Sequence, residues 1–94
     1  MNMKDIVKMA DAMNTYTPAL YAIQSKGFDV YIEPSEDENE IGDWVAVQED
    51  QTFYASDPLR LLGLISLWET RGSDWGRQKD EVNLYRECLD DTFS

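Results

Sequence analysis

The sequence contains no histidine and one cysteine, Cys88, among its 94 residues. Histidine is the commonest general base and metal ligand, and paired cysteines are needed for disulfides and for thiolate zinc sites. These absences remove most routes to nucleophilic catalysis and exclude an internal disulfide. We therefore expect a non-catalytic protein with no cofactor and no bound metal, in which Cys88 is an unreactive thiol in the core or at its boundary.

Glycines are few and scattered, and none precedes the Lys-Ser or Lys-Thr pair of a phosphate-binding loop. A calcium loop centred on Gly42 also fails, because Ile41 cannot ligate and Gln48 stands where a bidentate glutamate is needed. Pairs of carboxylates could support glycosidase-like chemistry. A domain of this size, however, has little room for the substrate cleft that such chemistry needs.

Long hydrophobic runs are missing as well. The longest apolar stretch, from Leu61 to Leu67, is interrupted by Gly63 and Ser66, whereas a membrane-spanning helix needs roughly twenty apolar residues. The first residues do not resemble a secretory signal. We expect one domain spanning residues 1–94, soluble and cytoplasmic, with an apolar share of 43% that suffices for a core.

Basic residues are absent from one contiguous third of the chain. No Lys or Arg lies between Phe28 and Leu59, a stretch that holds ten acidic residues: Asp29, Glu33, Glu36, Asp37, Glu38, Glu40, Asp43, Glu49, Asp50 and Asp57. The remaining nine acids face eight bases, so this stretch carries -10 of the net charge of -11. Such a concentration repels nucleic acids and anionic membranes and favours encounter with a basic protein.

Apolar spacing predicts two helices before the acidic stretch. Residues from Lys4 to Asn14 place their apolar side chains on one helical face. Thr17 and Pro18 are typical of a helix start, with the threonine as cap, and that second helix extends to Ser25. Gly27 is well placed to end it.

Three short strands are predicted next. Phe28 to Glu33 alternates between apolar and polar residues, Trp44 to Glu49 follows after a loop, and Thr52 to Ser56 follows a tight turn. Connections this short permit only antiparallel neighbours. We therefore expect an antiparallel meander.

A strongly apolar helix follows the strands. Asp57 and Pro58 mark its start and Gly72 its end. Gly63 lies in its middle, where glycine costs about 1 kcal/mol relative to alanine. We interpret Gly63 as the sign of a close approach by another helix or by the sheet.

The last helix is predicted from Ser73 to Asp91, with Val82, Tyr85 and Leu89 as its inner stripe. The resulting order is α-α-β-β-β-α-α. This order predicts an α+β fold in which the N-terminal and C-terminal helices pack on one face of the three-stranded meander.

One face of this sheet is the best candidate for binding. If Phe28, Val30, Ile32, Val45 and Val47 face the helices, aromatic and acidic side chains share the other face, a combination suited to gripping cations. The candidate partner-binding residues, with the acidic loop included, are Asp29, Tyr31, Glu33, Glu36, Asp37, Glu38, Glu40, Asp43, Trp44 and Tyr54. The alternative places Trp44 in the core with Val45 and Val47 outside, on a face that is merely solvated.

Charge and missing chemistry together favour a stoichiometric inhibitor that masks the basic, nucleic-acid-binding surface of a partner protein. A nuclease-toxin immunity protein or a phage-encoded anti-defence DNA mimic would have this character. We expect a nuclease or another nucleic-acid-binding protein as partner, with no direct binding of nucleic acid or membrane. The alternative is a small structural or adaptor subunit that assembles through the Leu59–Trp68 helix, and a homodimer remains open.

Overall fold

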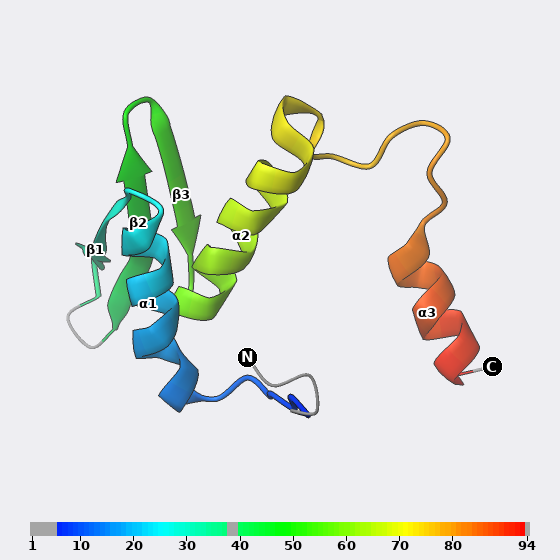
Figure 1. The fold of residues 1–94 in the computed structure, drawn as a ribbon, viewed down its shortest axis with the longest axis horizontal. Helices are drawn as coiled ribbons and strands as arrows, with labels where there is room; N and C mark the ends of the chain where they lie inside the picture. The colour runs from blue at the N-terminus through cyan, green and yellow to red at the C-terminus, as the bar shows by residue number, and fades with distance from the viewer. Residues whose placement is uncertain (1–5, 38–39, 94) are drawn as a thin grey trace.

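The computed structural model describes residues 6–37 and 40–93. Three α-helices flank three strands (Figure 1), and one-turn 3-10 helices precede α1 and follow α2. The elements are η1 (Met13–Thr15), α1 (Tyr16–Ser25), β1 (Asp29–Pro34), β2 (Ile41–Gln48), β3 (Gln51–Ala55), α2 (Pro58–Arg71), η2 (Gly72–Asp74) and α3 (Leu84–Phe93). The predicted α+β class and the strand meander between helices are confirmed.

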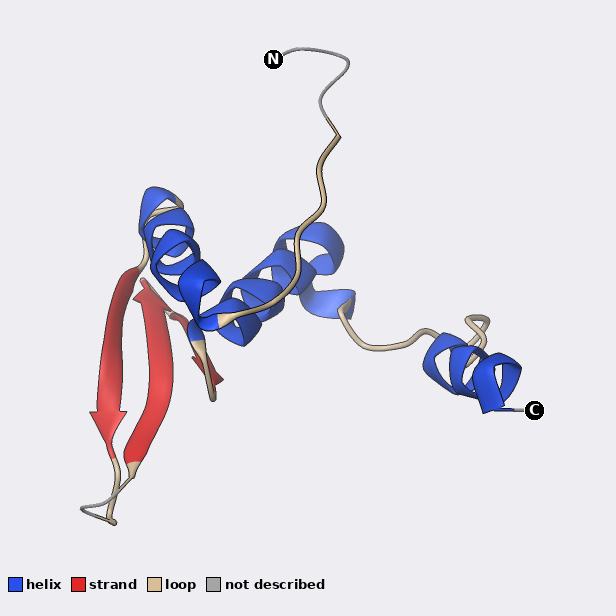
Figure 2. Cartoon of the chain, turned by 90° about the horizontal axis from the view of Figure 1, so that it is seen from below, coloured by secondary structure: helices blue, strands red, loops and turns tan. Residues whose placement is uncertain are grey.

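The sheet is antiparallel, with β2 in the middle of the order β1-β2-β3. Helices α1 and α2 lie on one of its faces (Figure 2), and no helix in the described ranges covers the other face. The two faces therefore differ: one is packed against helices and the other is open.

The core lies between the sheet and these two helices. Ile23 of α1 and Leu61 and Ile65 of α2 are fully buried together with Ala46 of β2. Phe28 joins them and meets Phe53 edge to face, with ring centroids 5.7 Å apart. Burying side chains of this size stabilises the fold by roughly 1.5–3 kcal/mol each, so a few residues hold the sheet and helices together.

The ends of α2 agree with the sequence signals. The Asp57 side chain accepts a hydrogen bond of 2.8 Å from the backbone N–H of Arg60, Pro58 is the first helical residue, and the helix ends at Gly72. An aspartate cap typically contributes about 1 kcal/mol. The predicted bounds of this helix are confirmed.

Helix α1 begins slightly earlier than predicted. Its first residue is Tyr16 and Thr15 precedes it, so Thr17 is not the cap. Pro18 lies in the first turn, where its missing N–H costs nothing. Gly27 follows the helix with a φ of +95°, and an added Cβ there would lie 2.5 Å from Nε2 of Gln48. That amide donates to the backbone oxygen of Lys26 at 3.2 Å and ties β2 to the end of α1.

The helix predicted from Lys4 to Asn14 is wrong for its described part. Residues 6–12 form no regular structure, and a single 3-10 turn follows them. The apolar side chains of Ile6, Val7 and Met9 are largely exposed. Short helices are marginal in water without a surface to pack on. This segment has the helical pattern, but its apolar side chains are not buried.

The last helix is shorter than predicted. It spans Leu84–Phe93, and the chain from Trp75 to Asn83 is irregular. The Asn83 side chain accepts a hydrogen bond of 3.1 Å from the N–H of Arg86, a start signal that the sequence analysis missed. The expected inner stripe of Val82, Tyr85 and Leu89 is exposed, and so is Cys88. The predicted packing of this helix and the placement of Cys88 in or near the core are therefore wrong.

The expectation for Gly63 is also wrong. An added Cβ there meets no atom within 4 Å, so no neighbour approaches α2 at this point. Of the helices in the described ranges, none is both long and apolar enough to cross a membrane.

Candidate functional site

The strand register decides which side chains occupy the open face. Tyr31 of β1 pairs with Val45, and Val45 pairs with Tyr54 of β3. Ile32 pairs with Trp44, which packs against the core with Ala46 as its face neighbour. Trp44 is therefore not on the binding face, and Val45 and Val47 are.

A one-residue ambiguity explains this correction. The run from Trp44 to Val47 is apolar at every position, so alternation cannot show which residues face inward. A register shift by one residue moves every side chain to the opposite face. The alternative reading of β2, with Trp44 inside, is the one that the structure supports.

Tyr31, Val45 and Tyr54 form a row across the open face. Val45 is 0% exposed although no described helix covers its face, while Tyr31 and Tyr54 are 50% and 52% exposed. Directly opposed side chains on neighbouring strands lie in contact distance. We infer that the two tyrosines shield Val45 while keeping about half of their own surface available.

Carboxylates gather at both ends of the sheet. Glu33, Glu36, Asp37, Glu40 and Asp43 lie around the β1–β2 connection. Glu38 falls outside the described residues. At the opposite end lie Asp29, Glu49 and Asp50, beside the β2–β3 turn. The five residue steps from Asp43 to Gln48 separate the two groups by roughly 17 Å at the rise of an antiparallel strand.

Gly42, considered in the sequence only as the centre of a calcium loop, shapes the end of the sheet where the first group of carboxylates lies. The β1–β2 register shifts between Ile32 and Pro34, and Gly42 lies against this irregularity. A Cβ added at Gly42 would overlap the backbone carbonyl of Glu33. Only glycine permits this close approach of the two strands, which brings Glu33 near the Gly42–Asp43 segment.

The basic residues of the helices pair elsewhere. Lys26 contacts Glu69 at 2.8 Å, Arg60 contacts Asp57 at 3.1 Å, and Arg86 contacts Asp90 at 3.3 Å. Arg71 pairs with Glu81. Of the acidic stretch, only Asp57 belongs to one of these pairs.

Most described carboxylates of the sheet therefore have no ion-pair partner. Within the described ranges, seven make no ion pair: Asp29, Glu33, Glu36, Glu40, Asp43, Glu49 and Asp50. The arginines of the last two helices do not neutralise them. The open face and its two ends form a negative surface around two half-exposed aromatic rings.

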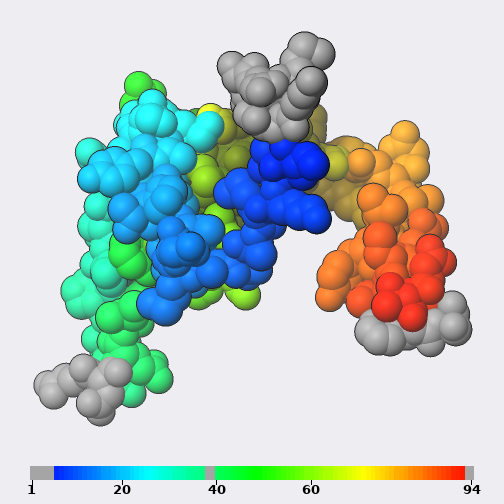
Figure 3. Space-filling view, turned by 60° about the horizontal axis from the view of Figure 1, so that its bottom comes forward, coloured from blue at the N-terminus to red at the C-terminus, as the bar shows by residue number. Residues whose placement is uncertain are grey.

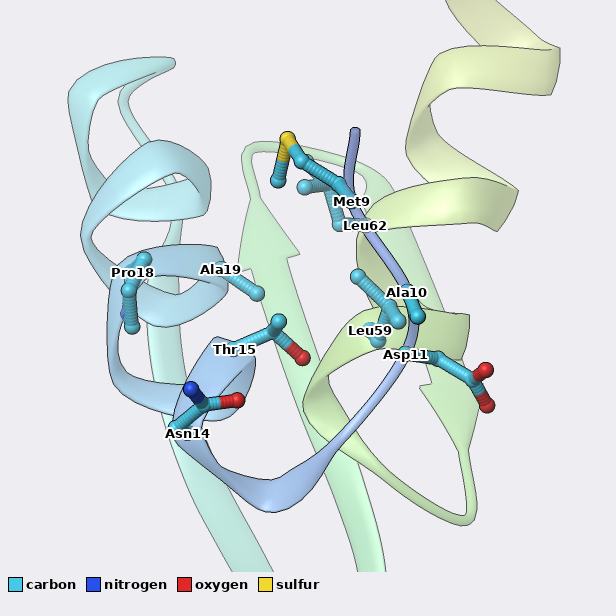
Figure 4. Close-up of a pocket in the computed structure, with 9 residues that line it drawn as sticks. All are labelled: Met9, Ala10, Asp11, Asn14, Thr15, Pro18, Ala19, Leu59 and Leu62. Atoms are coloured by element: carbon cyan, nitrogen blue, oxygen red, sulfur yellow. The ribbon is translucent and has the colours of Figure 1, made fainter. Parts of the chain in front are cut away.

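A concave region lies on the helical side of the molecule. Figure 4 shows it between α1, the start of α2 and the segment that precedes α1. Its volume is about 430 Å³. Its lining comprises Met9, Ala10, Asp11, Asn14, Thr15, Pro18, Ala19, Leu59 and Leu62. Asp11 is the one ionisable side chain among these described lining residues, which therefore hold no pair of carboxylates of the kind that glycosidase-like chemistry requires.

The chemistry available to the open face is recognition of cations. Lys or Arg of a partner can meet the carboxylates while stacking on Tyr31 or Tyr54. In the ranges that the structure describes, no three Asp, Glu or Cys side chains are grouped to hold a metal ion. The open face thus presents carboxylates and two half-exposed tyrosine rings on the same sheet.

Comparison with protein-family models finds no match, and comparisons with curated proteins and with solved structures find none either.

Proposed function

We propose that this chain is a non-catalytic inhibitor that masks the basic, nucleic-acid-binding surface of a partner protein. One observation carries the proposal: in the described ranges Asp29, Glu33, Glu36, Glu40, Asp43, Glu49 and Asp50 make no ion pair, and they flank the row of Tyr31, Val45 and Tyr54 on the face that no described helix covers. In the complex, the carboxylates would take the places of nucleic-acid phosphates.

The two kinds of side chain have different tasks in this proposal. Exposed carboxylates at the rim speed encounter with a basic partner, an effect that falls as salt rises. Tyr31 and Tyr54 offer aromatic surface that a partner can bury. A few such buried aromatic residues supply most of the affinity of a protein interface. An immunity protein against a nuclease toxin and a phage-encoded anti-defence DNA mimic would use the same surface.

A matched pair of charge variants tests the electrostatic part. The sheet variant combines Glu33→Gln, Glu36→Gln, Glu40→Gln and Asp43→Asn. The control removes four charges from the C-terminal region through Asp74→Asn, Asp80→Asn, Glu87→Gln and Asp91→Asn. Both lose the same net charge, so only the location differs.

The probe is the fraction of a cell lysate that is retained on DNA-cellulose and eluted by salt. We expect immobilised wild type to capture a basic protein from it at low salt and to abolish that protein's DNA binding in a gel-shift assay. The sheet variant should lower capture at least tenfold, and the control should stay within twofold of wild type. Equal capture by both variants would contradict the proposal.

The aromatic part has its own control. Tyr31→Ala and Tyr54→Ala remove the proposed anchors, while Tyr21→Ala removes an exposed tyrosine from α1, on the helical side. Truncating an anchor costs about 2 kcal/mol, or roughly 30-fold in affinity. Affinity for the captured protein should fall for Tyr31→Ala and Tyr54→Ala alone.

The second candidate, a structural or adaptor subunit, draws support from a smaller feature. Leu61 and Ile65 of α2 are buried in the chain's own core, whereas Leu64 and Leu67 are partly exposed. Assembly through this helix would therefore have to use its Leu64–Leu67 flank. Light scattering at micromolar concentration tests it, because assembly through this flank requires a stable, salt-insensitive oligomer, and a monomer would contradict this candidate.

A further inference from the structure

Helix α3 has an apolar half that no described part of the chain covers. At about 3.6 residues per turn, Leu84, Tyr85, Cys88, Leu89 and Thr92 fall on one half and the charged residues on the other. Leu84 and Tyr85 are 64% and 78% exposed. A ten-residue helix is marginal in water on its own, so α3 needs a surface that buries its apolar half.

An apolar hollow of about 240 Å³ lies between β3 and the second half of α2. Its lining is entirely apolar or aromatic: Phe53, Leu64, Leu67, Trp68 and Trp75. Trp75 lies in the irregular chain after η2, lines this hollow and is 58% exposed. We call this the Trp75 groove. It offers the kind of surface that α3 lacks.

The chain holds its own α3 away from this groove. The Arg71 guanidinium binds both carboxylate oxygens of Glu81, and the N–H of Gln78 donates to Glu81 Oε1 at 2.7 Å. The Gln78 side chain donates to the backbone oxygens of Asp74 and Gly76 at 2.8 and 2.9 Å. These contacts fold the connector onto itself, and α3 stands apart from the rest of the molecule (Figure 3). The two apolar surfaces of one chain do not meet.

Charge does not oppose α3 of another copy beside α2. The three charged residues of α2 are already paired, Arg60 with Asp57, Glu69 with Lys26 and Arg71 with Glu81, whereas α3 carries Arg86 against Glu87, Asp90 and Asp91, a net -2. The acidic stretch belongs mainly to the sheet and its turns. A contact between α3 and α2 thus keeps the negatively charged α3 away from the acidic face, which would repel it.

We propose that α3 docks into the Trp75 groove of a second copy of this chain, and that two copies exchange these helices reciprocally. Covering the exposed apolar parts of α3 and the groove twice removes on the order of 1,000 Å² from water, the size at which specific interfaces begin. The dimer does not rest on the proposed inhibitor function, because it leaves Tyr31 and Tyr54 free.

Light scattering on the full chain with matched variants tests the proposal. Wild type should give twice its chain mass of 10.9 kDa between 1 and 100 µM (roughly the range of moderate affinities). Leu89→Lys on α3 and Leu67→Lys in the groove should each weaken the dimer at least tenfold. Asp91→Lys on the charged half of α3 and Ser66→Lys on exposed α2 surface should not. A monomeric wild type over this range overturns the proposal.

Cross-linking identifies which groove α3 occupies. A chain carrying Cys88→Ala and Leu67→Cys is mixed with a chain that keeps Cys88, so that a disulfide between the two positions can form only between copies. We expect an oxidised heterodimer on a non-reducing gel, and none when Ser66→Cys replaces Leu67→Cys. A single chain carrying Leu67→Cys and Cys88 that oxidises to an internally linked monomer places α3 in its own groove, and the proposal is then wrong.

Discussion

The body of the molecule and its C-terminal arm use apolar residues very differently. In the body, from α1 to α2, Leu61 and Ile65 are fully buried. In the arm, residues 72–93, Leu84 and Tyr85 are mostly exposed although α3 is as clearly amphipathic. Helix α2 follows the sheet directly and packs on it, whereas an irregular connector separates α3 from any surface. Apolar spacing predicts a helix, but it does not say what the helix packs against.

Matched leucine truncations should give the largest effect and test this comparison directly. Leu61→Ala should lower the free energy of unfolding by about 2–5 kcal/mol, because it opens a cavity in a closed core. Leu84→Ala should stay within about 0.5 kcal/mol. Urea denaturation at submicromolar protein measures both without contribution from association. A similar cost for Leu84→Ala would mean that the arm belongs to the cooperative core.

Two glycines extend the comparison to the backbone. Gly42→Ala should cost about 1–3 kcal/mol, because the new methyl group overlaps the carbonyl of Glu33 and forces the strands apart. Gly76→Ala in the arm should be nearly neutral, since an added Cβ there meets no atom within 4 Å. Thermal unfolding of both variants beside wild type checks the difference. An equally stable Gly42→Ala protein would show that the β1–β2 bulge can relax freely.

Much of the body could be predicted from the sequence because its signals are local. Asp57 and Pro58 start α2 through a cap and a fixed φ, and the alternation after Phe28 gives β1. The segments before α1 and after η2 could not be predicted in the same way. Residues 6–12 have the spacing of a helix, but their side chains stay exposed, and burial against a surface decides whether short helices form.

The binding face was predictable in part. Asp29 and Tyr31 on β1 are on the open side as alternation indicates, because β1 is polar on one face. The placement of β2 was not, because Trp44, Val45, Ala46 and Val47 satisfy either register. The pairing of the arginines was also beyond sequence reasoning. Only the fold brings Arg71 to Glu81 and leaves sheet carboxylates such as Asp29 and Asp43 without an ion pair among the described residues.

We expect a substitution at Gly63 to stabilise the body, because a glycine inside a helix is less favourable than an alanine. Gly63 lies inside α2 with open space around its α-carbon. Gly63→Ala should raise the free energy of unfolding by about 0.5–1 kcal/mol, because alanine loses less backbone entropy in a helix. Urea denaturation measures the gain. A loss of stability would indicate a neighbour at this surface, such as another copy.

Acid should loosen the arm before it affects the body. The hydrogen bonds from the Arg71 guanidinium, and then that from the Gln78 N–H, lower the pKa of Glu81 from 4.5 to about 2, and the same carboxylate raises the pKa of Arg71. Because the folded pKa of Glu81 is depressed, its contribution is complete above about 4.5 and is lost as the pH falls toward 2.

The amide signal of Gln78 reports on this contact, since its N–H binds Glu81 Oε1. Its chemical shift should titrate with a midpoint well below 4.5, near 2, in wild type, and Arg71→Gln should move the midpoint back toward the ordinary value of a glutamate. Signals of Val45 and Leu61 should change little over the upper part of this window, because neither residue contacts the arm. A Gln78 midpoint near 4.5 in wild type would mean that the Arg71–Glu81 pair does not hold the connector in solution, and α3 would then be free to reach its own groove.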